Sequence, residues 1–174
     1  MRKLSLMMAL LAALGLFAAC SEGYDYTAQE VYDAVKEAYG EDFIPDGEMD
    51  DEDFVEDYGL DLDDIEDKKG AFTRTSLYPD RFVVIKAKSG RGDEVEKALR
   101  AVCDGLVENS IWTVTYLPKL SAAQVVRKDD YVAFIMLGAV DENLTTCAGE
   151  EQALFAKEQV QIGVDAFYDL FEKE

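Results

Sequence analysis

The sequence predicts an α+β fold, in which an antiparallel sheet of about four strands carries helices on one face. Apolar residues at helical spacing mark three long segments, and runs of β-branched and aromatic residues mark the strands. Short turns join the strands in pairs, which favours antiparallel pairing, so the expected order is α-β-β-α-β-β-α. No linker divides residues 27–174, which we interpret as a single domain.

The first helix is expected to begin after Thr27 and to end at Gly40. Thr27 is followed three residues later by Glu30, which is the pattern of a capping box. Val31 and Val35 belong to an apolar stripe with helical spacing, and Gly40 is a stop signal.

Residues 41–67 are strongly acidic, with 15 Asp and Glu residues in 27 positions and no Lys or Arg. Such a density of like charge favours disorder when it stands alone. Apolar residues are interleaved here, however, and Phe54, Val55 and Tyr58 fit one turn of a short helix that ends at Gly59. We therefore expect a partly ordered acidic lobe whose apolar side chains dock on the core.

The first strand pair is predicted at residues 70–77 and 81–88, around a turn signal at residues 78–81. A helix follows, with Asp93 as its expected N-cap. Its long apolar stripe places Cys103 on the buried face.

The second half of the chain repeats this order. Residues 111–117 fit either a strand or a packed loop, which Pro118 would end. The second strand pair is predicted at residues 122–127 and 131–137, and a final helix from about Gly149 to Phe171. The expected core face of this helix consists of Val160, Val164, Phe167 and Phe171.

The N-terminus has the layout of a secretory signal. Arg2 and Lys3 precede an uncharged apolar run over residues 4–17, which is shorter than the roughly 20 residues of a transmembrane helix. Residues 16–20 (LFAAC) resemble a bacterial lipobox. We therefore predict a lipoprotein signal peptide over residues 1–19 with lipid attachment at Cys20; an ordinary secretory signal with a chance Cys is the alternative.

The predicted mature chain has residues 20–26 as a lipid-anchored tether. Loss of Arg2 and Lys3 changes the formal net charge from −20 to −22. An anionic membrane surface repels so acidic a domain, so the lipid must hold it at the extracytoplasmic face of the cell membrane. Two or more acyl chains on one Cys give a stable anchor.

Two cysteines remain in the predicted mature chain besides Cys20. Cys103 and Cys147 are an even number in an oxidising compartment, so a disulfide between them is one expectation. The other is two separate buried thiols, because a free Cys packs as a small apolar residue.

Four parts of the mature chain have a recognisable pattern. They are residues 57–61 (DYGLD) with 65–67 (IED), 82–88 (FVVIKAK), 94–99 (EVEKAL) and 125–132 (VVRKDDYV). Through them the chain resembles a bacterial lipoprotein family known by its domain of unknown function, DUF4358. The resemblance implies a small lipoprotein exposed outside the membrane of a Gram-positive cell, and it implies no activity, cofactor or site residue.

Composition excludes several function classes. The chain has no His, which removes His metal ligands and every catalytic pair or triad that needs imidazole. Its acidic balance excludes nucleic acid as an expected partner, because Lys and Arg supply most of the affinity for phosphates.

The acidic lobe contains the candidate metal ligands Asp61, Asp63, Asp64 and Glu66. Ca²⁺ takes six to eight oxygen ligands, and weak Ca²⁺ sites are common outside cells. The spacing does not match an EF-hand loop in any register that begins at Asp46 or Asp61. A solvated acidic surface is the alternative interpretation.

Trp112 and Tyr116 are the candidate binding surface, because they lie in the one segment without a clear assignment. Tyr and Trp are well suited to contacts with glycans or peptides, and they also fill the cores of small domains. Sequence alone leaves both roles open.

The leading interpretation is a non-enzymatic, membrane-anchored binding or accessory module with an acidic face. An extracytoplasmic protein or a cationic peptide is the expected partner, because the negative charge would steer basic groups toward it. The first alternative is a protein that binds Ca²⁺, with no other cofactor expected. The second is a cell-envelope hydrolase that uses paired carboxylates.

Overall fold

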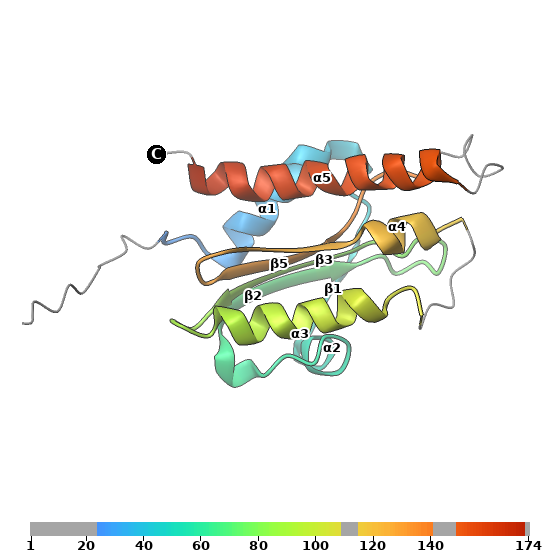
Figure 1. Cartoon of the computed structure of the whole chain (residues 1–174). Helices are drawn as coiled ribbons and strands as arrows, with labels where there is room; N and C mark the ends of the chain where they lie inside the picture. The colour runs from blue at the N-terminus through green and yellow to red at the C-terminus, as the bar shows by residue number, and fades with distance from the viewer. Residues whose placement is uncertain (1–23, 109–114, 141–148, 173–174) are drawn as a thin grey trace, which may run out of the picture.

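Two layers of helices enclose a five-stranded antiparallel sheet (Figure 1). The computed structural model describes residues 24–108, 115–140 and 149–172. The strands are β1 (Gly47–Glu48), β2 (Ile65–Phe72), β3 (Arg81–Ala87), β4 (Gln124–Lys128) and β5 (Tyr131–Met136). Their order across the sheet is β1-β2-β3-β5-β4, with every neighbouring pair antiparallel.

The helices lie on both faces of the sheet. Helices α1 (Ala28–Tyr39) and α5 (Glu150–Glu172) cover one face, while α2 (Asp51–Glu56) and α3 (Gly92–Gly105) cover the other (Figure 1). The short helix α4 (Leu117–Ala122) lies at one end of the sheet and contacts α5. Two 3-10 turns, η1 (Gly40–Asp42) and η2 (Leu62–Asp64), complete the elements.

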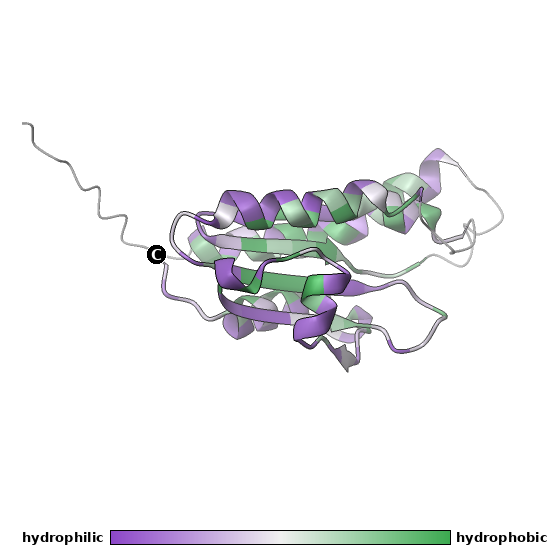
Figure 2. Ribbon diagram, turned by 90° about the horizontal axis from the view of Figure 1, so that it is seen from below, coloured by the Kyte–Doolittle hydropathy of each residue, from purple (hydrophilic) through white to green (hydrophobic). Residues whose placement is uncertain are grey.

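The predicted α+β class is confirmed. Two details of the prediction are wrong: helices cover both faces of the sheet rather than one, and the sheet has five strands rather than about four. In β3, Phe82 and Val84 face α1 and α5, whereas Val83 and Ile85 face α3. Strands that are buried on both faces have continuous apolar sequences rather than alternating ones, and β3 and β5 are such runs. Figure 2 shows the apolar residues concentrated in the central strands. The added strand is β1, which has only two residues.

The first strand pair is shifted from its predicted position. Strand β2 covers Ile65–Phe72 instead of residues 70–77, and residues 73–80 form the connection to β3. Charged residues in β2, such as Lys68 and Lys69, are half-buried on a strand that β1 covers only at Ala71 and Phe72. Charges on a strand edge discourage pairing with other chains, and they also hide the strand from sequence patterns.

Two predicted boundaries are wrong for local reasons. The N-cap of α3 is Arg91, and no side chain caps this helix; the carboxylate of Asp93 instead pairs with Arg127. Pro118 begins a helix rather than ending a segment, because a proline in the first turn of α4 loses no hydrogen bond. Residues 111–114 lie outside the described residues.

Helices α1 and α5 and the second strand pair are confirmed, although β4 begins at Gln124 rather than at residue 122 and the short helix α2 ends at Glu56 rather than at Gly59. Thr27 and Glu30 form the expected capping box of α1, and Gly40 ends the helix with a positive φ of 55°. The β4–β5 hairpin turns at Asp129, and the predicted core face of α5 is buried.

The acidic segment is folded onto the sheet. Phe54, Tyr58 and Leu60 are all buried against the α3 face, as expected for a docked lobe. Within the ranges that the structure describes, no helix is long and apolar enough to cross a membrane.

Candidate functional site

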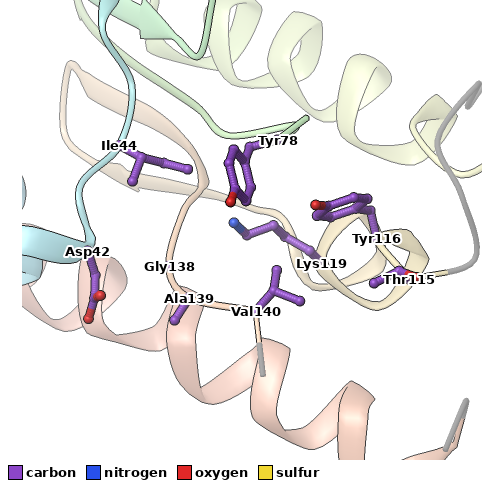
Figure 3. A pocket seen from close by; sticks show the side chains of 9 residues that line it. All are labelled: Asp42, Ile44, Tyr78, Thr115, Tyr116, Lys119, Gly138, Ala139 and Val140. Atoms are coloured by element: carbon purple, nitrogen blue, oxygen red, sulfur yellow. The ribbon is translucent and has the colours of Figure 1, made fainter. Parts of the chain in front are cut away.

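A pocket of about 640 Å³ lies beyond one end of the two central strands (Figure 3). Its walls come from the segment before β3, the segment after β5, the start of α4 and the region of η1. The lining residues are Asp42, Ile44, Tyr78, Thr115, Tyr116, Lys119, Gly138, Ala139 and Val140. This volume is in the range of roughly 300–1,000 Å³ that small-molecule sites occupy.

Lys119, which lines this pocket, belongs to a buried ion pair with Asp80. Lys119 Nζ lies 2.6 Å from both Oδ1 and Oδ2 of Asp80. Their side chains are only 5% and 0% exposed. Asp80 immediately precedes the central strand β3, and Lys119 lies in α4, so the pair joins one end of the sheet to the short helix.

Asp80 is held by backbone groups as well. The backbone N–H groups of Asp80 itself and of Gly138 favour the charged form of its carboxyl and so lower its pKa. Its carbonyl oxygen accepts from the N–H of Thr73 at 3.0 Å and from the Thr73 hydroxyl at 3.3 Å. Thr73 therefore holds the backbone of Asp80, while Lys119 holds its carboxylate.

Burial shifts the pKa of both members of the ion pair in the direction that favours their neutral forms. It raises the pKa of the Asp80 carboxyl, although the charge of Lys119 opposes the shift. It lowers the pKa of the Lys119 ammonium, although Asp80 opposes that shift. Each partner opposes the effect of burial on the other, so the charge of the Lys119 ammonium is balanced by the Asp80 carboxylate within the protein.

Two tyrosines form a corner of the pocket. The rings of Tyr78 and Tyr116 meet edge to face, with centroids 6.3 Å apart and an interplanar angle of 81°. The Tyr78 side chain is 40% exposed. Tyr116 thus belongs to the pocket, as the predicted binding surface would require, while Trp112 lies outside the described residues.

The opposite wall is fixed against α5. Gly138 has a φ of 108°, and a Cβ at this position would lie 2.6 Å from Cβ of Gln159. The Gln159 side chain accepts a hydrogen bond from the N–H of Ala139 at 3.0 Å. Only glycine fits here without strain, so Gly138 brings the wall close to the helix.

Three of the four candidate metal ligands have other partners for their carboxylates. Asp61 accepts from the N–H of Asp63 at 2.9 Å, as the cap of η2. Asp64 accepts two hydrogen bonds from Arg91 at 2.6 and 2.9 Å. Glu66 pairs with Lys86 at 3.0 Å. Among the described residues, no three acidic or Cys side chains gather as metal ligands, and the Ca²⁺ site stays a prediction.

Of the three cysteines, the structure describes Cys103. Cys103 is half-buried, and its Sγ lies 3.2 Å from the carbonyl oxygen of Ala123. Burial raises the pKa of this thiol. Cys20 and Cys147 lie outside the described residues, so lipid attachment and the disulfide stay predictions.

Sequence reasoning missed Asp80 and Lys119. Asp80 lies in a stretch that indicates a turn, and Lys119 follows a proline in a segment without a clear pattern. The two residues are 39 positions apart, and their pairing depends on how α4 packs against the end of the sheet.

Comparison with known proteins gives one match. The model of the family described as Domain of unknown function (DUF4358) matches residues 40–137, which is more than half of the chain. The matched range contains Tyr78, Asp80, Tyr116 and Lys119. No curated protein and no solved structure shows a significant match.

Proposed function

The chain belongs to the DUF4358 family, and we propose that it is a membrane-anchored extracytoplasmic lipoprotein that acts as a non-enzymatic binding module. Lipid on Cys20 would hold it at the membrane. The pocket beyond the central strands would receive the ligand.

The start of the described chain is fastened to one end of the sheet, which supports this proposal. The hydroxyl of Tyr131 donates to the carbonyl oxygens of Tyr24 at 2.9 Å and Tyr26 at 2.7 Å. The Tyr24 ring packs edge to face against Phe171, with centroids 4.9 Å apart. A short tether to Cys20 would hold this end of the domain within about 14 Å of the lipid, since four extended residues span no more.

The arrangement of the two ends is the observation that carries the proposal. Tyr131 begins β5, whereas Gly138 follows the far end of the same strand and lines the pocket. The six residues of β5 span about 17 Å. Figure 1 shows the beginning of α1 and the helix α4 at opposite ends of the sheet. A lipid at Cys20 would therefore leave the pocket facing away from the membrane.

The acidic face supports a basic partner. We define this face by the exposed carboxylates of α2 and its flank, namely Asp51, Glu52, Glu56 and Asp57. Val55 lies among them and is 44% exposed. Such a surface would attract a cationic peptide or a basic patch on an extracytoplasmic protein.

Mass spectrometry of the mature protein tests the anchoring. We expect a chain that begins at Cys20 and carries a diacylglyceryl group in the membrane fraction. Cys20→Ser should leave the protein uncleaved or soluble without its lipid. An unmodified N-terminus at another residue in the wild-type protein would overturn the proposal.

A further inference from the structure

The pocket beyond the central strands combines an ammonium group, hydroxyl groups and two aromatic rings. We propose that it binds a neutral saccharide that carries an acetamido group, with the acetamido carbonyl at Lys119. This inference deepens the proposed function and rests on it only in taking this pocket as the binding site; it does not depend on the lipid anchor.

The charge balance of the pocket disfavours anions. Lys119 is the cation among the described lining residues, and Asp80 at 2.6 Å already neutralises it. Asp42, a second carboxylate, lies in the lining itself. With a formal net charge of −20 on the whole chain, a phosphate or carboxylate ligand would be repelled.

Cations fit the pocket equally poorly. Lys119 and Asp80 balance each other, so the pair offers a cation no net negative charge. Asp42 is the one carboxylate in the described lining, whereas a Ca²⁺ ion needs six or more oxygen ligands. A neutral ligand is the remaining class.

Lys119 has a donor to offer such a ligand. An ammonium group has three N–H donors, and two of them are directed at the oxygens of Asp80. Figure 3 shows the end of the Lys119 side chain pointing toward Tyr78, inside the pocket. An amide carbonyl is a strong neutral acceptor for the third N–H, and the apolar side chains of Ile44 and Val140 suit the methyl group of the same acetamido unit.

The two tyrosines suit a sugar ring. Their rings meet at 81°, so that a ligand in the corner contacts one ring face and one ring edge. An aromatic face packs well against the apolar C–H side of a sugar, while the hydroxyls of Tyr78 and Thr115 offer hydrogen bonds to sugar hydroxyls.

The position of the pocket favours a sugar over an extended peptide. One recurring way in which proteins bind an extended peptide is to add it to a sheet edge, where main-chain hydrogen bonds provide affinity. This pocket lies beyond the ends of β3 and β5, which are both central strands. Its walls are loops and a short helix rather than an edge strand.

Nuclear magnetic resonance titration of the mature chain with Cys20→Ser tests the inference. The probes are N,N′-diacetylchitobiose, cellobiose (which lacks acetamido groups) and trilysine. We expect diacetylchitobiose to shift the amide signals of Gly138 and Ala139 to saturation, and cellobiose to bind at least tenfold more weakly. Tyr78→Ala should weaken binding at least tenfold. Tyr168→Ala is the matched control, since Tyr168 is similarly exposed at 37% but hydrogen-bonds Arg127 of β4.

Each other outcome has a definite meaning. Trilysine binding at Gly138 and Ala139 without diacetylchitobiose binding would overturn the saccharide inference and leave a binding module in place. Equal affinity for cellobiose would overturn the role of the acetamido group. No shift with either sugar, or shifts confined to other residues, would overturn the inference altogether, while the mass of the mature N-terminus judges the anchoring separately.

Discussion

Lys119 and Asp80 depend on each other because neither charge is accessible to water. Removing one member of a buried ion pair leaves the other charge without compensation, which costs far more than replacing both. We expect Lys119→Met to lower the free energy of unfolding by about 3–5 kcal/mol. The double variant Asp80→Asn with Lys119→Met should recover most of this loss. Urea unfolding of the wild type, Lys119→Met, Asp80→Asn and the double variant measures the coupling; a loss in the double variant equal to the sum of the two single losses would show that the pair is not coupled.

Asp64 makes the stability of the fold depend on pH in the acidic range. The hydrogen bonds from Arg91 hold the pKa of the Asp64 carboxyl below its ordinary value. A carboxyl with a depressed pKa stabilises the folded state above the unfolded pKa of about 3.9, and the contribution disappears as the pH falls through the folded pKa.

Asp64→Asn should therefore lower the melting temperature at pH 7, and the difference from wild type should shrink as the pH falls below the unfolded pKa of about 3.9. The effect should be small because Arg91 is exposed. Asp63→Asn is the matched control, since Asp63 contacts Lys88 through its backbone carbonyl. A difference that persists at low pH would contradict this explanation.

Local sequence patterns predict contacts within one helical turn, but they do not predict contacts between residues that are far apart in the sequence. Capping residues such as Thr27 and Gly40 act within one turn, so local patterns predicted them. Asp80 and Lys119 meet only after β3 and α4 have packed together, and each occupies a position with an ordinary local explanation. Tyr116 was predicted as a binding residue because its segment had no other assignment, and it lies in the pocket.

Helices α1 and α5 approach closely at a single glycine. The hydroxyl of Tyr39 donates to the carbonyl of Gln159 at 2.9 Å and accepts from the N–H of Gly163 at 3.1 Å. A Cβ at Gly163 would lie 2.8 Å from this hydroxyl and 3.0 Å from Cγ2 of Ile135. The two helices therefore have no room for a methyl group between them.

Gly163→Ala should destabilise the protein by about 1–3 kcal/mol, because overpacking outweighs the gain in helix propensity of about 1 kcal/mol. Adding Tyr39→Phe should reduce the cost of the alanine. Gln161→Ala, at an exposed position two residues away, should stay within about 0.5 kcal/mol of wild type. A Gly163→Ala variant with increased stability in chemical unfolding would show that the helices can separate.

The element predictions succeeded where periodicity was local and strong. The hairpin of β4 and β5 and the apolar face of α5 follow from their patterns. Strand β2 was misplaced because Asp67, Lys68 and Lys69 interrupt its apolar pattern, and β1 is too short for any pattern. The second helical layer could have been predicted from the continuous apolar runs of β3 and β5, which require cover on both faces.

At the scale of the whole molecule, the formal charge of −20 would attract basic partners through long-range electrostatics. If the acidic face recruits a basic partner, the association rate should fall as salt rises, because the Debye length falls from about 10 Å at 0.1 M to about 3 Å at 1 M. Trilysine-coated beads and the purified mature protein provide the measurement. Asp51→Asn with Glu52→Gln should weaken the salt dependence, and binding that does not respond to salt would contradict the role of this face.

The most direct test of the central claim places the lipidated protein on a bilayer. Nanodiscs with gadolinium-labelled headgroups broaden the amide signals of residues close to the membrane. Because Tyr131 holds Tyr24 and Tyr26 beside the β4–β5 turn, we expect strong broadening at Asp129 and Asp130 in this turn. We expect little broadening at Gly138 and Ala139. Equal or stronger broadening at Gly138 and Ala139, or no association with the bilayer, would contradict a membrane-anchored module that presents its pocket outward.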